Sequence, residues 1–263
     1  MTKNVLNQNA KYVQDLIDTI EPDFIFNNRP VNRLKVIKDV NDNNNQDKLE
    51  KLSKLKNQIN SIQNCNLRAN SKKLIFGDGD IDSPIMLIGE NPNEKDENLG
   101  LSFQGEIGEL LTKMLLAINI KRDKIYLTYS INFKTPEDRK PTSQEIKRYS
   151  EFLKEHISII NPKVLILMGS TAMEAITGLN NKISNERGKW KEIILKDKTL
   201  PLIITFSPSY LIRFPNYKKY SWEDLKKIKN KIQELKIEIF KFRKNYSWKR
   251  SYVFKKNRLM KNY

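Results

Sequence analysis

The chain has 263 residues, of which 38% are hydrophobic, and a formal net charge of +17. This length suits one well-cored domain with terminal extensions and excludes two full-sized domains. The charge indicates a polyanionic partner, most simply DNA, and the alternative is a lysine bias of the whole proteome. Cys65 is the only cysteine and no apolar run approaches the roughly 20 residues of a membrane span, so we expect a cytoplasmic monomer without disulfides or contact with a membrane.

The first 47 residues are predicted to be a helical leader followed by a polar linker. Helical spacing covers residues 12–17, and the low-complexity stretch 41–47 is expected to be a loop. Helical periodicity returns over residues 48–62. We therefore place the main domain at residues 48–239 and a separate tail at 240–263.

Short apolar runs alternate with amphipathic stretches through the middle of the chain. Parallel strands need a helical crossover, so this alternation predicts an α/β fold, a three-layer αβα arrangement with a central, mostly parallel four-stranded sheet. The expected strands are 85–88, 125–130, 164–168 and 202–206, and the expected helices are 107–118, 143–160 and one from Thr171.

Ligands of such sheets bind beyond the carboxyl ends of the strands, so the loops there are the candidate site. Residues 89–94 form a tight corner with backbone N–H groups and two carboxylates. Phe103 lies on a glycine-containing loop where its ring could stack on a base, and residues 207–213 follow the last strand.

Taken in order, these segments resemble the uracil-DNA glycosylase superfamily, most closely its family 4 branch, over about residues 65–225. Residues 30–34 resemble the leader of bacterial members once labelled phage-type DNA polymerases, although no residue supports a polymerase activity. The resemblance implies a glycosylase that flips a base into a pocket and stabilises an oxocarbenium-like sugar while water attacks. The matching blocks are 74–80, 85–92, 103–115, 124–141, 159–169, 187–190 and 205–213.

The resemblance assigns the chemistry to the corner. Glu90 matches the family 4 glutamate, and Asn91 is similar to the asparagine that positions water in the mismatch-specific and single-strand-selective branches. The alternatives are that Glu90 caps the following helix and that Asn91 is a turn residue. Gly89, Phe103, Tyr129 and Ser207 are expected around the base, with Phe103 stacking on it.

Two positions in the pocket depart from family 4. Ser207 stands in place of the histidine of the second motif, although residues 207–209 are similar to the mismatch-specific branch. Tyr129 stands in place of the asparagine that reads the uracil edge, and Asn132, three residues on, would face differently. Phe103 and Tyr129 could instead be core residues, and we expect the only histidine, His156, on the surface of its helix.

The ligands of the family 4 iron–sulfur cluster are reduced to Cys65. Ile62, Phe133 and Tyr149 stand where other cysteines would be, so we expect no cluster, no metal and no other cofactor.

Contacts with DNA are expected from both loops that flank the pocket. The alternatives are helix capping for the serines and a solvated charge cluster for the basic residues. The expected DNA-binding residues are Lys134, Arg139, Ser209, Tyr210 and Arg213.

After an amphipathic helix that runs from Ser221 to about residue 239, the tail 240–263 has nine Lys or Arg and no acidic residue, interleaved with aromatic rings. This composition favours contact with single-stranded nucleic acid, and a disordered or docked tail is the alternative.

Three functions follow, in order of preference. The first is a cluster-free, family 4-like, monofunctional DNA glycosylase of base-excision repair. The second is a DNA-binding protein descended from such an enzyme that has lost base excision. The third is RNA binding through the tail alone.

Overall fold

The structure is a computed structural model that describes residues 40–196 and 198–237. The chain divides into two compact units, Met1–Asn43 and Asn44–Tyr263. The predicted leader helix at residues 12–17 and the tail 240–263 lie outside the described residues. In the described part of the chain, no helix combines the length and apolarity needed to cross a membrane.

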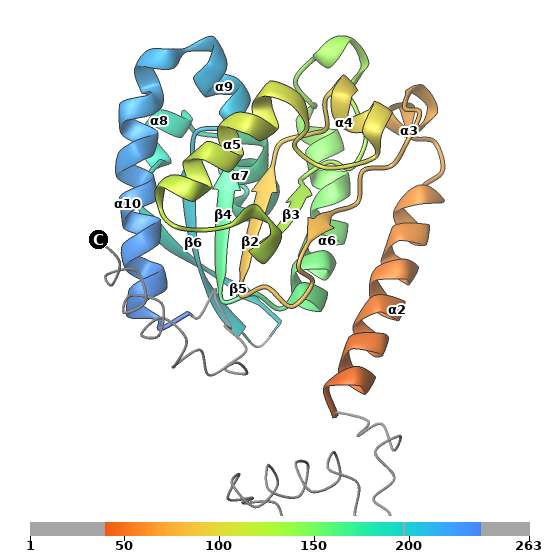
Figure 1. The fold of residues 1–263 in the computed structure, drawn as a ribbon. Coiled ribbons are helices and arrows are strands. Elements are labelled where there is room, and N and C mark those ends of the chain that lie inside the picture. Colours follow the sequence, from red (N-terminus) through yellow and green to blue (C-terminus); the bar gives the residue numbers. More distant parts are fainter. Residues whose placement is uncertain (1–39, 197, 238–263) are drawn as a thin grey trace, which may run out of the picture. The chain divides into compact units, whose positions relative to one another are not determined.

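The second unit is built around a six-stranded sheet of order β1-β3-β2-β4-β6-β5 (Figure 1). The neighbours β3-β2, β2-β4 and β4-β6 are parallel, whereas β1 and β5 pair antiparallel at the two edges. The strands are β1 (Asp78–Gly79), β2 (Ile85–Gly89), β3 (Tyr126–Tyr129), β4 (Val164–Met168), β5 (Trp190–Leu195) and β6 (Lys198–Thr205).

Helices cover both faces of the sheet because alternate strand residues point to opposite sides. Met86 and Ile88 of β2 pack in one hydrophobic cluster with α6 (Ser143–Ile160) and α7 (Ser170–Thr177). Ile85 and Leu87 pack in a second cluster with α5 (Gly105–Ala117) and α10 (Lys218–Glu234). Since every residue of β2 and β4 is buried, these strands are continuous apolar runs rather than alternating ones.

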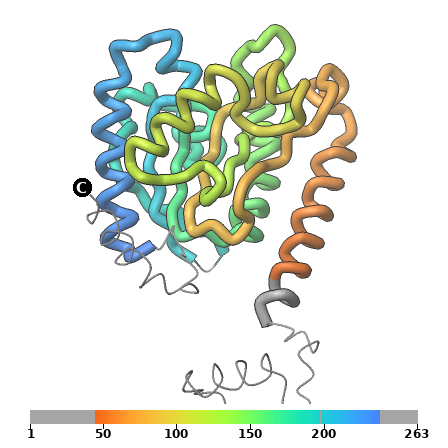
Figure 2. The backbone as a smooth tube through the Cα atoms, in the orientation of Figure 1, coloured from red at the N-terminus to blue at the C-terminus, as the bar shows by residue number. Residues whose placement is uncertain are grey.

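The segments that follow the parallel strands gather at one end of the sheet. Figure 2 places the yellow chain after β2 and the blue chain of α9 at this same end. The remaining helical segments are α3 (Asn66–Asn70), α4 (Glu94–Leu99), η1 (Arg122–Lys124), η2 (Pro136–Asp138), α8 (Ile183–Glu186), α9 (Pro208–Arg213) and η3 (Pro215–Tyr217).

The α/β class and the four predicted strands agree with the structure, but the sheet has six strands rather than four. β1 is only two residues long, which is too short for a periodic pattern. β5 is a half-exposed edge strand that carries Lys191 and Glu192 among its apolar residues, so it lacks the buried run that identified the others.

The prediction of a loop at residues 41–47 is wrong, because helix α2 runs over Val40–Asn60. Asparagine-rich sequence favours turns, but tertiary contacts override this weak local preference. The Lys48 ammonium donates to the carbonyl of Ile81 at 2.7 Å and to the Asp82 carboxylate at 3.0 Å. Leu52, Leu55 and Ile59 then bury the rest of the helix against the domain.

The prediction that His156 lies on the surface is also wrong. Its side chain is buried on α6, stacked on the Phe76 ring at 4.3 Å, with Nε2 2.9 Å from the hydroxyl of Tyr126. Burial lowers the pKa of His156 to about 3, because the charged imidazolium would lose its hydration. His156 is therefore a neutral core residue, remote from the candidate site.

Candidate active site

A pocket of about 480 Å³ opens at the carboxyl ends of β2, β3, β4 and β6. This volume lies within the range of roughly 300–1,000 Å³ that is typical of ligand pockets. The corner after β2 and the loop after β6, which the sequence predicted to converge, both line it. Of the candidate residues, Lys134 alone is not among the lining residues, and the pocket brings together Gly89, Glu90, Asn91, Phe103, Tyr129, Arg139, Ser207, Ser209, Tyr210 and Arg213.

The carboxylate of Glu90 is held by the next strand-to-helix unit. Its Oε1 accepts from the Thr171 N–H at 3.2 Å and from the Ser170 hydroxyl at 3.4 Å. It thus lies at the positive end of α7, where an anion is stabilised, and it is half-buried. Glu90 does not cap α4, the helix that follows it, because Asn93 does so.

Two glycines allow this corner to close. A Cβ atom at Gly169 would lie 2.2 Å from the carboxyl carbon of Glu90, and one at Gly89 would lie 2.6 Å from the ring of Phe103. Gly169 also has φ +102°, which only glycine adopts without strain.

The amide of Asn91 joins the corner to the loop after β3. Its Nδ2 donates to the hydroxyl of Thr135 at 3.3 Å and to the carbonyl of Pro92 at 3.3 Å. Thr135 is fully buried, so the amide has a fixed partner on one side. This arrangement orients the amide on the pocket wall.

Phe103 and Tyr129 form a stacked pair in the pocket wall. Their ring centroids are 4.6 Å apart, and both side chains are almost fully buried. The Tyr129 hydroxyl accepts from the Phe103 N–H at 2.8 Å and donates to the Asp96 carboxylate at 2.7 Å. Burial raises the pKa of Tyr129 well above its ordinary value, so the phenol stays protonated and positions the Phe103 loop.

Asp96 is the centre of this wall, and sequence reasoning missed it. The buried carboxylate accepts from the Gln104 N–H at 2.6 Å and the Asn93 N–H at 2.8 Å, in addition to Tyr129. Burial raises the pKa of Asp96, and these hydrogen bonds oppose that rise. Asn93 and Asp96 have the spacing of a capping box, so the sequence could have identified this pair as a helix cap. It could not have shown that Asp96 also contacts Tyr129.

Arg122 holds the Phe103 loop from the other side and was also missed. Its guanidinium donates to the carbonyls of Phe103, at 2.8 Å, and Ser102. Phe103 has φ 51°, an uncommon value for a bulky residue, which such a set of contacts can maintain. Nothing in the local sequence distinguishes this arginine from a surface residue.

On the opposite wall, Ser207 is the N-cap of α9. Its hydroxyl accepts from the Tyr210 N–H at 3.4 Å and lies 3.0 Å from the hydroxyl of Ser209. Pro208 occupies the first turn, where its missing N–H is harmless. Tyr210 is half-buried and Arg213 is exposed, so this wall presents a ring and a cation.

A sequence model described as the uracil DNA glycosylase superfamily matches residues 76–226, more than half of the chain. The chain belongs to the uracil DNA glycosylase superfamily. The resemblance found in the sequence is thereby confirmed, and the match contains every candidate residue of the pocket.

Individual relatives agree with this assignment. The chain is 32% identical to a Type-4 uracil-DNA glycosylase of Thermotoga maritima over 65% of its own length and 88% of the relative. It is 31% identical to a Type-4 uracil-DNA glycosylase of Sulfurisphaera tokodaii over 73% of its length and 90% of the relative. It is also 29% identical to a DNA polymerase of Bacillus phage SP01, over 60% of this chain but 17% of the polymerase.

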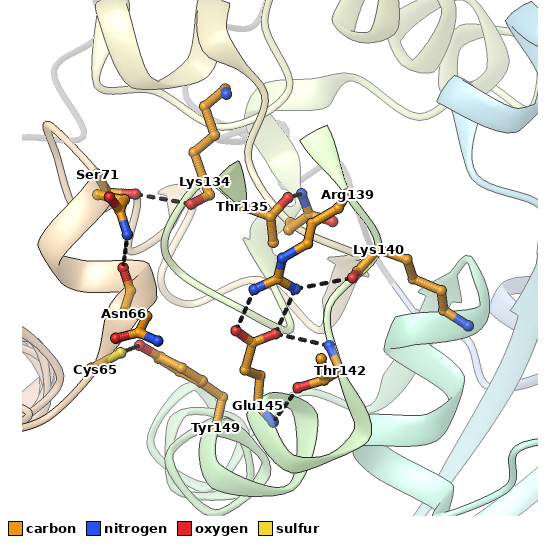
Figure 3. A network of polar contacts seen from close by, with 12 residues as sticks. Cys65, Asn66, Ser71, Lys134, Thr135, Arg139, Lys140, Thr142, Glu145 and Tyr149 are labelled. Atoms are coloured by element: carbon orange, nitrogen blue, oxygen red, sulfur yellow. Dashed lines mark hydrogen bonds and ion pairs between the residues drawn. The ribbon is translucent and has the colours of Figure 1, made fainter. Parts of the chain in front are cut away.

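The positions compared above with the superfamily's cluster cysteines do not provide an iron–sulfur ligand set. The Cys65 sulfur lies 3.2 Å from the hydroxyl of Tyr149 (Figure 3). Tyr149 packs edge-on against Phe133 at 6.3 Å, and Ile62 is buried in the same hydrophobic cluster. One thiol among apolar and phenolic side chains does not fit a cluster that needs four ligands. Among the described residues, no group of three His, Cys, Asp or Glu side chains could hold a metal ion.

Lys134 and Arg139, the two candidate DNA-binding residues after β3, are paired with carboxylates. Arg139 binds Glu145 through two hydrogen bonds of 2.9 and 2.7 Å, as Figure 3 shows. The Arg139 guanidinium lowers the pKa of Glu145 to about 2. The Lys134 ammonium lies 3.2 Å from the carboxylate of Asp138. A DNA phosphate would have to share or replace these partners, so the role of both cations in binding DNA stays a prediction.

Proposed function

We propose that this chain hydrolyses the N-glycosidic bond of a flipped uracil, or of a related deaminated base, in DNA during base-excision repair. The observation that carries this proposal is that the corner with Glu90 and Asn91 lines the same pocket as the loop from Ser207 to Arg213. Membership of the superfamily and the names of the Type-4 relatives support it.

Cleavage of the bond leaves electron density on the departing base and positive charge on the sugar. We assign the stabilisation of that charge to the Glu90 carboxylate, since a fixed anion favours a developing cation. The Asn91 Nδ2 is held by Thr135 and Pro92, and its carbonyl oxygen can accept a hydrogen bond from the attacking water and so orient it. The electron pair of the broken C–N bond leaves with the base, and the water oxygen bonds to the sugar carbon. The proton that this water loses passes to solvent, from which the departing base is protonated, and the Phe103 ring packs against the extruded base.

We further propose a monofunctional enzyme that works without an iron–sulfur cluster. We assign the nucleophile to water rather than to a lysine: Lys140 is the one lysine among the described residues that line the pocket, and its side chain is exposed to solvent. The apolar packing around Tyr149 would then stabilise the region that a cluster holds in other members.

A gel assay of strand cleavage on DNA with uracil, hypoxanthine or mismatched bases tests this proposal. We expect the parent to produce abasic product and the variants Glu90→Gln and Asn91→Ala to be slower by roughly 10²–10³-fold, the usual effect of removing a group that stabilises a transition state. Glu174→Gln, on α7 but outside the pocket lining, is the matched control and should retain parental activity. Equal activity of parent and Glu90→Gln on every substrate would contradict the assigned roles.

A second candidate function is DNA binding without base excision. It is favoured by Tyr129, whose hydroxyl is already engaged by Asp96 and the Phe103 N–H and so offers no unpaired group to the edge of a base. The variant Tyr129→Asn separates the two functions. Binding without product from the parent, together with product from the variant, would support the second candidate and refute the first.

A further inference from the structure

A row of aromatic rings runs from the pocket to the start of α10. The buried Phe206 stacks on Tyr210 with centroids 5.0 Å apart and ring planes 12° apart. Tyr210 then contacts Phe214 at 4.8 Å and Tyr217 at 5.3 Å, and Tyr217 contacts Tyr220 at 5.9 Å. We call Tyr210, Phe214, Tyr217 and Tyr220 the aromatic ladder.

The outer rings of the ladder are open to solvent. Phe214 is 43% exposed and Tyr220 is 37% exposed, although both are large apolar side chains. Exposed apolar groups that gather in one patch, unlike scattered ones, mark an interaction site. The ladder therefore offers ring faces to a partner.

Most of the charges around the ladder are positive, and the exposed carboxylate of Glu223, three residues after Tyr220, lies 3.8 Å from Arg187. Residues 207–221 contain Arg213, Lys218 and Lys219 and no acidic residue. The Lys219 ammonium lies over the Tyr220 ring, 4.9 Å from its centre, and the Arg187 guanidinium lies over the same ring at 5.4 Å, so positive charge lies directly against the ladder. A partner that fits this surface carries flat apolar groups and regularly spaced negative charge.

A buried ion pair holds the far end of the ladder in place. Arg187 donates through Nε to Asp224 at 2.9 Å and through Nη2 to the carbonyl of Tyr220 at 2.6 Å. Asp224 is fully buried and also accepts from the Thr205 hydroxyl of β6 at 2.8 Å. Since these contacts tie the start of α10 to the sheet, the ladder is already ordered before a ligand binds, which lowers the entropic cost of binding.

We propose that the aromatic ladder binds unpaired DNA bases adjacent to the nucleotide in the pocket, so that the substrate is DNA with a single-stranded stretch beside the target base. Rings can stack only on bases whose faces are free, which a duplex hides between neighbouring pairs. The three cations supply phosphate contacts along the same path. The proposal rests on the proposed function in taking DNA as the substrate, and it adds the strand state of that DNA.

Fluorescence anisotropy with the full chain tests the ladder directly. The probe is a labelled, uracil-free oligothymidylate of roughly 12 nucleotides, within the usual site size, used alone and annealed to its complement. Phe214→Ala and Tyr220→Ala should each weaken single-strand binding about tenfold, the usual effect of losing one stacking ring, and change duplex binding less than about twofold. Tyr220→Phe should retain parental affinity because it keeps the ring, whereas Tyr220→Leu should not.

Trp222→Ala is the matched control, because Trp222 is 45% exposed on α10 but makes no ring contact with the ladder among the described residues. It should bind both probes like the parent. Three outcomes would overturn the proposal. The first is an equal loss of affinity for the single-stranded and duplex probes. The others are unchanged binding by Phe214→Ala and Tyr220→Ala, or full affinity of Tyr220→Leu, and either would leave the surface to a protein partner. Since the probe contains no uracil, failure here is distinct from failure of base excision.

Discussion

The two walls of the pocket are built in different ways. The corner wall, residues 89–104 with Tyr129, is a buried polar network in which Asp96 accepts from three donors. The loop wall, residues 206–220, is a row of contacting rings with exposed cations and a single serine cap. Polar atoms that are fully paired inside a low-dielectric wall have one favourable arrangement, whereas dispersion contacts between rings are individually weak and not directional.

The difference indicates that the two walls have different functions. A reacting group must be held within a fraction of an ångström, and the corner wall carries Glu90 and Asn91 on a framework of hydrogen bonds. A surface that accepts a strand of any sequence gains from stacking contacts, because every base has a ring face, and the loop wall carries rings suited to this. Three experiments test whether this difference is real.

The largest effect is expected from Asp96→Ala. It leaves two N–H groups and the Tyr129 hydroxyl without their acceptor in a buried wall, and each unsatisfied donor costs about 1–3 kcal/mol. We expect the free energy of unfolding to fall by about 3 kcal/mol in urea denaturation. Asp123→Ala is the control, because its side chain is 68% exposed, and it should change stability by less than about 0.5 kcal/mol. A similar small change for Asp96→Ala would mean that the corner wall is not held by this carboxylate.

A smaller effect is expected from pH, at the Arg139–Glu145 pair beside the corner wall. Arg139 lowers the pKa of Glu145 from its ordinary value of 4.5 to about 2, so folding favours the ionised carboxylate. The resulting stability is present above pH 4.5 and is lost as the pH falls through about 2. Because solvent screens a surface pair, we expect about 1 kcal/mol.

Urea denaturation of the parent and of Arg139→Ala over this pH range measures the contribution of the pair. The difference between the two proteins should be greatest near neutral pH and should vanish in strong acid. Lys124→Ala, which removes an exposed cation from a loose pair at 3.7 Å, should give no such pH dependence. A difference that grows in acid would show that the pair acts in the opposite sense.

The smallest effect is expected on the loop wall, from Ser207→Ala. Loss of the cap removes a long hydrogen bond of 3.4 Å from the Tyr210 N–H at the end of a short helix and should cost about 0.5 kcal/mol. Ser184→Ala, at an exposed position of α8, is the control and should be neutral. Thermal unfolding of both variants gives the comparison, and a loss as large as that of Asp96→Ala would erase the distinction between the walls.

Much of the fold could be predicted from the sequence because the central strands are continuous apolar runs. The run at residues 164–168 and the amphipathic stretch at residues 143–160 match β4 and α6 in the structure. The edge strand β5 could not be found in this way, since it is half-exposed and its partner is set by a hairpin rather than by burial. His156 was misplaced because its polar residue type was given more weight than its spacing: it lies three residues after Leu153 and four before Ile160, on the buried face of α6.

The site was predictable where its residues follow strands directly. Glu90 comes directly after β2 and Ser207 comes two residues after the end of β6, and both line the pocket. Asp96 and Arg122 act through side chains that cross between elements, and their partners are set by tertiary packing rather than by spacing along the chain. The contact of Tyr129 with Asp96 could not be predicted for the same reason.

The approach of Gly169 to Glu90 links two strands in a way that limits how the protein can evolve. A methyl group at position 169, directly after β4, would lie 2.2 Å from the carboxyl carbon of Glu90, the residue directly after β2, and would collide with it. A side chain at position 169 would therefore displace the Glu90 carboxylate, whereas a change at position 90 can leave Gly169 in place. Exchange of the acid for a smaller side chain would remove this collision but not the requirement for glycine, because φ +102° at position 169 strains any residue that carries a Cβ atom.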